Sequence, residues 1–203
     1  MTCKASALAR TRAWMLLPAL LAAGPAALIA GCGRSPNTQF FTLAPTRPDS
    51  TRRTFAGAPV QVRAVHIPAY LDRPQRVIGR SPQRLDILET QQWGGPLDDM
   101  IRRVLTEDLA TRLGPDSVVP ANVPAPPGSR GLVVDIEEFQ PDASGAVLLD
   151  ASWVVRGNAR QGVQGQQRLQ VASGTGADAQ VQAMSTLLGR LADAIAAALG
   201  SSP

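Results

Sequence analysis

Cys32 has the clearest chemistry in the sequence, because the residues before it form a recognisable pattern. It closes the run Ile29-Ala30-Gly31-Cys32, in which an aliphatic residue and two small residues precede a cysteine. This is the pattern of a lipobox, whose small residues fit a signal-peptidase cleft and whose thiol is alkylated by a diacylglycerol. Cleavage then frees the amino group of Cys32 for a further acyl chain. Two or more chains are enough to anchor a protein stably to a membrane.

The segment before Cys32 has the other features of an export signal. An uncharged apolar stretch spans residues 13–30, and prolines interrupt it, which disfavours a permanent transmembrane helix. The start is basic, with Lys4, Arg10 and Arg12. We predict that residues 1–31 are a removable signal peptide and residues 32–38 a lipidated tether. Gly33 follows Cys32 where an inner-membrane lipoprotein commonly has Asp, so we expect attachment to the periplasmic face of the outer membrane.

Removal of the signal changes the charge and the cysteine content. The chain has 20 basic and 16 acidic residues, and the predicted signal holds three of the basic ones. The mature chain then has 17 basic and 16 acidic residues, a net charge of +1. Because polyanion binding requires clustered cations, the sequence argues against a nucleic-acid partner. Cys3 leaves with the signal, which leaves neither a disulfide pair nor a cysteine cluster for a metal.

His66 is the only histidine and therefore the first candidate for catalysis. A Ser-His-Asp arrangement stays open at this point, but the sequence has no Gly-x-Ser-x-Gly elbow to support it. One histidine without a free cysteine also disfavours a transition-metal site. We interpret His66 as a surface or half-buried structural residue.

Two further patterns could carry chemistry. Asp135, Glu137 and Glu138 form an acidic cluster with Asp142, and strand alternation would place Asp135 and Glu137 on one face and Glu138 on the other. A solvated sheet face, or protection of a sheet edge, explains the cluster more simply than acid-base catalysis. Residues 174–179 are similar to a dinucleotide fingerprint, but the chain ends after the helix that they open. The sequence predicts no catalytic set, metal or cofactor, and hence not an enzyme.

Periodicity predicts the elements that must position these residues. Strands are expected at 39–43, 60–65, 76–78, 85–88, 132–139, 146–156 and 167–171, and a turn at 70–74. Two amphipathic helices are expected at 96–113 and 178–199. The first helix has Leu or Ile at every fourth position, namely Leu97, Ile101, Leu105, Leu109 and Leu113, and Gly114-Pro115 ends it. We predict a single α+β domain over residues 39–203, a mostly antiparallel β-sheet with two helices packed on it.

Several segments resemble the PqiC family of ABC-type transport auxiliary lipoproteins. Besides the lipobox, the resemblance rests on Phe40-Phe41-Thr42-Leu43, the strand 60–65 and residues 85–89. The most specific segments are Tyr70-Leu71-Asp72-Arg73-Pro74-Gln75 and the Trp93-Gly94-Gly95-Pro96-Leu97 junction before the first helix.

The resemblance implies a non-enzymatic outer-membrane lipoprotein that serves an MCE-type system for envelope lipid transport and membrane integrity. Its partners would be an MCE-domain protein and the ABC components of the inner membrane, and it would act as an oligomer. Candidate contact residues are Tyr70, Leu71, Arg73 and Trp93, unless these side chains only pack the fold. The alternative function is a periplasmic lipid carrier with its own apolar cavity.

Overall fold

The structure is a computed structural model that describes residues 36–48, 55, 57–157 and 162–200. The chain from Asn37 to Pro203 forms one compact unit. The predicted signal peptide and the lipobox with Cys32 lie outside the described residues.

Five strands form the larger sheet, in the order β5-β2-β6-β7-β8. They are β2 (Val60–His66), β5 (Val118–Val119), β6 (Arg130–Pro141), β7 (Ala146–Arg156) and β8 (Val163–Ala172). The strands β6, β7 and β8 form an antiparallel meander, as the sequence predicts. In contrast, β2 runs parallel to both of its neighbours, β5 and β6.

A smaller sheet has the order β1-β4-β3. Its strands are β1 (Gln39–Phe41), β3 (Gln75–Ser81) and β4 (Arg84–Trp93). The strands predicted at 76–78 and 85–88 lie in β3 and β4, which pair antiparallel, and β1 adds to β4 in parallel.

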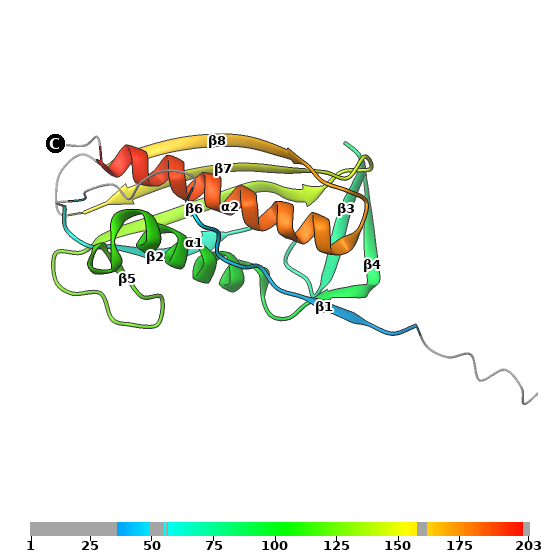
Figure 1. Cartoon of the computed structure of the whole chain (residues 1–203), viewed down its shortest axis with the longest axis horizontal. Coiled ribbons are helices and arrows are strands. Elements are labelled where there is room, and N and C mark those ends of the chain that lie inside the picture. The colour runs from blue at the N-terminus through cyan, green and yellow to red at the C-terminus, as the bar shows by residue number, and fades with distance from the viewer. Residues whose placement is uncertain (1–35, 49–54, 56, 158–161, 201–203) are drawn as a thin grey trace, which may run out of the picture. The chain divides into compact units, whose positions relative to one another are not determined.

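Two helices, α1 (Leu97–Leu113) and α2 (Ala177–Gly200), cover one face of the larger sheet (Figure 1). The short 3-10 helix η2 (Pro115–Ser117) follows α1. All five residues of the predicted α1 stripe are buried against the sheet. By length and hydropathy α2 could span a membrane, but most of that helix is buried inside the domain. The predicted α+β class is therefore confirmed, with two sheets and some parallel pairs in place of one antiparallel sheet.

Two β-bulges change which residues lie on each face of the larger sheet, compared with strict alternation. In β2 the register shifts between Val62 and Ala64, so Val65 is buried and Ala64 is only partly buried. In β6 it shifts between Ile136 and Glu138. Since a bulge inserts one unpaired residue, alternation restarts after it. Glu138 consequently lies on the outer face beside Asp135, and the prediction that it takes the opposite face is wrong.

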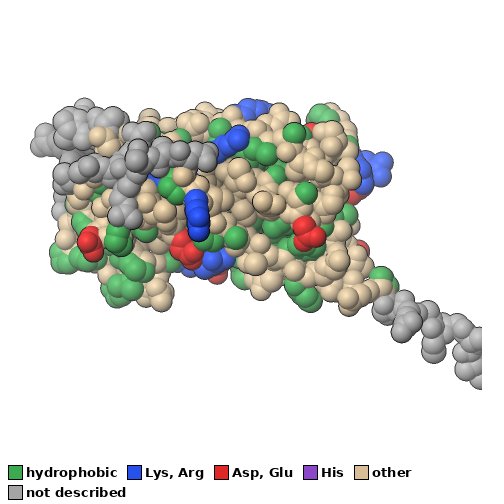
Figure 2. Space-filling model, in the orientation of Figure 1, with side chains coloured by type: hydrophobic (Ala, Val, Ile, Leu, Met, Phe, Trp, Pro, Cys, Tyr) green, Lys and Arg blue, Asp and Glu red, His purple; other side chains and the backbone are tan. Residues whose placement is uncertain are grey.

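The outer face of the larger sheet is polar. There Arg168 on β8 lies 3.5 Å from Glu138 on β6 and 3.2 Å from Asp150 on β7, so one cation faces two carboxylates from the neighbouring strands. Cationic and anionic side chains are also interspersed on the face of the molecule that Figure 2 shows.

Candidate functional site

The two most specific sequence segments meet at one place in the fold. The backbone N–H of Trp93 donates to the carbonyl of Pro74 at 2.7 Å, which joins the end of β4 to the turn before β3. The two segments line a pocket of about 330 Å³. Its lining consists of Asp72, Arg73, Pro74, Trp93, Gly94, Gly95, Pro96 and Leu97. We call it the motif pocket.

The turn that forms one wall of the motif pocket is fixed by its own backbone. The N–H of Leu71 donates to the carbonyl of Pro68 at 2.9 Å, and the Nε of Arg73 donates to the carbonyl of Tyr70 at 2.8 Å. The hydroxyl of Tyr70 donates to the Oε1 of Gln140 at 2.9 Å and so ties the turn to β6. Burial raises the pKa of Tyr70, and the nearby carboxylate of Glu138 raises it further. Tyr70 is thus a neutral hydrogen-bond donor that holds the turn.

The four predicted contact residues divide into two groups. Leu71 and Trp93 are buried, with exposed fractions of 3% and 6%, and belong to the hydrophobic core. Tyr70 and Arg73 are half-buried. Arg73 and the edge of Trp93 also line the motif pocket, whereas Leu71 and Tyr70 do not. The structure therefore brings Arg73 and Trp93 together at an accessible site and uses Leu71 for packing.

Gly95, within the family-like junction from Trp93 to Leu97, also lines the motif pocket. A Cβ atom at this position would have no atom within 4 Å, and the backbone φ lies outside the left-handed region that favours glycine. Neither packing nor backbone geometry in the folded chain thus requires glycine here. A larger side chain can therefore be introduced at this lining position without a clash at its Cβ.

A buried arginine packs against Trp93, one of the residues that line the motif pocket. Arg76 on β3 is 1% exposed, and its guanidinium carbon lies 5.0 Å from the ring centre of Phe41 and 5.8 Å from that of Trp93. It donates to the Oε1 of Gln91 at 2.5 Å and to the Oε1 of Gln180 at 2.9 Å, while its Nε has no partner. Burial lowers the pKa of Arg76 to about 10, although Asp178 opposes the shift. The guanidinium joins β1, β3, β4 and α2.

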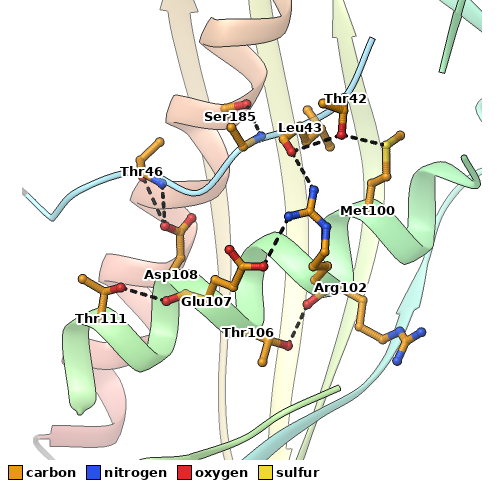
Figure 3. A network of polar contacts seen from close by, with 12 residues as sticks. Thr42, Leu43, Thr46, Met100, Arg102, Thr106, Glu107, Asp108, Thr111 and Ser185 are labelled. Atoms are coloured by element: carbon orange, nitrogen blue, oxygen red, sulfur yellow. Dashed lines mark hydrogen bonds and ion pairs between the residues drawn. The ribbon is translucent and has the colours of Figure 1, made fainter. Parts of the chain in front are cut away.

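The segment after β1, which we call the strap (residues 42–46), crosses both helices (Figure 3). On α1, Arg103 donates to the carbonyl of Leu43 at 2.8 Å. The N–H of Thr46 donates to the Oδ1 of Asp108 at 2.8 Å. Asp108 is fully buried, and burial raises its pKa despite these hydrogen bonds and the adjacent Arg112.

The strap also lies close against α2. The N–H of Ala44 donates to the Oγ of Ser185 at 3.2 Å. A Cβ atom on Gly189 would come within 2.0 Å of the Oγ1 of Thr46, so the absence of a side chain lets the strap pass. The start of the domain is therefore fixed to β4, α1 and α2, and the remaining chain toward Cys32 is short.

The other candidate chemistry does not assemble into a site. His66 lies 2.6 Å from the Oδ1 of Asp135, but both side chains are more than half exposed on the outer face. No serine hydrogen-bonds to His66 in the described part of the chain. This is a surface pair, which fits the structural interpretation of His66. Among the described residues, no group of three His, Cys, Asp or Glu side chains could hold a metal ion.

The chain is similar to a known protein family over most of its length. The family model described as "ABC-type transport auxiliary lipoprotein component" matches residues 41–196, from Phe41 in β1 into α2. The chain belongs to this family. The match includes the strap, Arg76 and the complete motif pocket, so these features lie within the family domain. A transport-associated lipoprotein is thereby shown, and the family is not one of enzymes.

Solved structures show the same fold. A crystal structure of an uncharacterized protein is 21% identical, with a TM-score of 0.68, and the match covers 79% of this chain and 97% of that chain. A Xanthomonas campestris protein of the DUF330 family is 12% identical, with a TM-score of 0.64 and coverage of 79% and 95%. A search of curated proteins gave no match.

Proposed function

We propose that this chain is a non-enzymatic lipoprotein of the PqiC kind, tethered to the outer membrane by lipid on Cys32. In this role it docks an MCE-domain protein of an ABC-type lipid transport system and supports membrane integrity. The observation that carries the proposal is the motif pocket, since the two most family-like segments build one accessible site. Docking requires a fixed surface, and hydrogen bonds and core packing hold both walls of this pocket.

Arg73 suits a protein partner, because arginine is enriched among the residues that dominate binding energy. Trp93, which is 6% exposed, supports the wall of the pocket. The pocket is also small, about 330 Å³, which fits one or two side chains of a partner better than a phospholipid with two acyl chains.

The alternative, a lipid carrier with an internal cavity, receives less support from the packing. Side chains that face the space between the sheet and the helices are fully buried against one another, among them Leu132, Leu149, Leu188 and Leu191. Three surface pockets are lined without any residue of α2. A bound acyl chain would therefore have to displace packed core residues.

Affinity purification from detergent-solubilised membranes tests the docking role. We expect the tagged full chain to bring down an MCE-domain protein and an ABC ATPase. Recovery of the tagged chain without either component would contradict the proposal. Crosslinking of the purified protein tests the oligomer that the family resemblance implies.

Labelled palmitate tests the anchor separately. We expect the wild-type chain to incorporate label and to fractionate with outer membranes, and the Cys32→Ser variant to incorporate none. Equal labelling of both chains would refute Cys32 as the lipidated residue. Labelled protein in the inner-membrane fraction would refute the outer-membrane location while leaving the anchor in place.

A further inference from the structure

Phe40 is the most exposed large hydrophobic residue in the described part of the chain. Its exposed fraction is 69%, compared with 44% for Val123 and 42% for both Leu85 and Ile87. The adjacent Phe41 points the other way and packs on Arg76. Burying a phenylalanine side chain is favourable, so an apolar surface that covered this ring would gain binding free energy.

The position of Phe40 is fixed relative to the rest of the domain. It lies opposite Gln92 in the parallel pairing of β1 with β4. The strap that follows is bound to both helices through Leu43, Ala44 and Thr46. The ring is therefore presented on a rigid surface and does not sit on a free tail.

The covalent distance to Cys32 restricts what can cover this ring. Phe40 is the eighth residue after Cys32. At about 3.5 Å per residue, the connection spans at most about 28 Å when fully extended. In the proposed function, lipid on Cys32 holds that residue at the membrane interface. The start of β1 then stays close to the bilayer at all times.

The charge of the surrounding chain also fits a lipid surface. From Gly33 to Pro48 the sequence has two arginines, Arg34 and Arg47, and no acidic residue. The β4 residues paired with β1 are uncharged, namely Gln91, Gln92 and Trp93. Anionic headgroups would thus meet no carboxylate along this segment, and apolar rings beside basic residues are typical of chains that lie in the interface.

We infer that the Phe40 side chain inserts into the surface of the phospholipid bilayer beside the lipid anchor. The inference rests on the proposed anchoring at Cys32. Contact at Phe40 would give the domain a second attachment to the membrane besides the lipid on Cys32. The domain then has a preferred orientation, with β1 and the small sheet nearest to the membrane.

Site-directed spin labelling measures whether position 40 lies in the bilayer. The chain has only two cysteines, Cys3 in the predicted signal and Cys32, whose thiol the lipid blocks. A Phe40→Cys variant of the mature lipoprotein would therefore carry one free thiol for a nitroxide label. Val123→Cys gives a matched control at an exposed apolar position far from β1 in the sequence.

The labelled lipoproteins are inserted into vesicles of phosphatidylethanolamine and phosphatidylglycerol, and flotation verifies attachment. We expect oxygen, which concentrates in the bilayer, to relax the label at position 40 more than a water-soluble nickel chelate does, and the reverse at position 123. Equal access of the nickel chelate to both positions in floating protein would overturn the Phe40 contact and leave the anchor intact. Protein that does not float refutes the anchor, and the contact falls with it.

Discussion

The guanidinium carbon of Arg76 lies 5.0 Å from the ring centre of Phe41, so the strand nearest to Cys32 packs directly on a buried positive charge. Trp93 lies on the same guanidinium at 5.8 Å and also lines the motif pocket. One side chain thereby connects β1 with the site proposed for docking.

Replacing Arg76 should weaken the packing of both Phe41 and Trp93. Arg76→Ala removes two cation-π contacts and leaves the amides of Gln91 and Gln180 without their donor. We expect a loss of about 3 kcal/mol in the free energy of unfolding, as for truncation of a large buried side chain. Urea unfolding measures the loss, and hydrogen exchange should show faster exchange at residues 39–41. Unchanged protection of β1 would contradict the connecting role of Arg76.

Gly189 should be intolerant of any side chain, because the strap passes over it. Gly189→Ala places a Cβ atom within 2.0 Å of the Thr46 Oγ1, and such overpacking costs about 1–3 kcal/mol. Thr46→Ala removes the clashing oxygen. In a double-mutant cycle, the cost of Gly189→Ala should therefore be smaller in the Thr46→Ala background. Equal costs in both backgrounds would show that the strap is not held against α2.

The raised pKa of Asp108 predicts an unusual pH dependence of the folding stability. Burial raises its pKa, so the folded protein binds the proton more tightly than the unfolded chain does. The resulting penalty is present above the raised pKa and disappears as the pH falls through it. Asp108→Asn has no such titration. The stability of the wild type relative to Asp108→Asn should therefore increase on acidification from neutral pH, and a constant difference in urea midpoints would contradict it.

The lowered pKa of Asp142 predicts a pH dependence of stability opposite in sign to that of Asp108. Its Oδ1 accepts hydrogen bonds from the N–H and hydroxyl of Ser144 and from the N–H of Ala146, and these bonds lower its pKa. The stabilisation is complete above the ordinary pKa of 3.8 and is lost as the pH falls below it. The advantage of the wild type over Asp142→Asn should consequently shrink in acid. Urea unfolding of the wild type and of Asp142→Asn over a series of pH values measures the difference in stability, and a difference that stays constant with pH would contradict the prediction.

Much of the fold could be predicted because its periodicity is local. The four-residue spacing from Leu97 to Leu113 predicts α1, and the meander β6-β7-β8 follows from short connections between apolar strands. The parallel pairing of β2 with β6 could not be predicted in this way. Those strands are separated by β3, β4 and α1, and a strand's own residues do not encode the direction of its neighbour.

The site was only partly predictable, for physical reasons. Tyr70 to Pro74 and Trp93 to Pro96 could be singled out by resemblance, but their meeting at one pocket depends on the β3-β4 hairpin between them. Arginines are usually exposed, so the burial of Arg76 had no local signal. Arg112 lies in the last turn of α1, a common position for a solvent-exposed cation. It bridges the helices instead, with its Nε 2.7 Å from the Oδ1 of Asp193 on α2.

Gly95→Leu tests most directly whether the motif pocket docks the transport system. No atom lies within 4 Å of a Cβ at this position, so we expect an unchanged urea midpoint. Because Gly95 lines the pocket, we expect the leucine side chain to obstruct it. Val123→Leu, at an exposed position outside the pocket, is the matched control. When the variants are purified from membranes, Gly95→Leu should recover about tenfold less of the MCE-domain protein and the ATPase than the control does. This corresponds to a loss of about 1.4 kcal/mol in binding free energy. Equal recovery of both components with the two variants would contradict docking at this pocket.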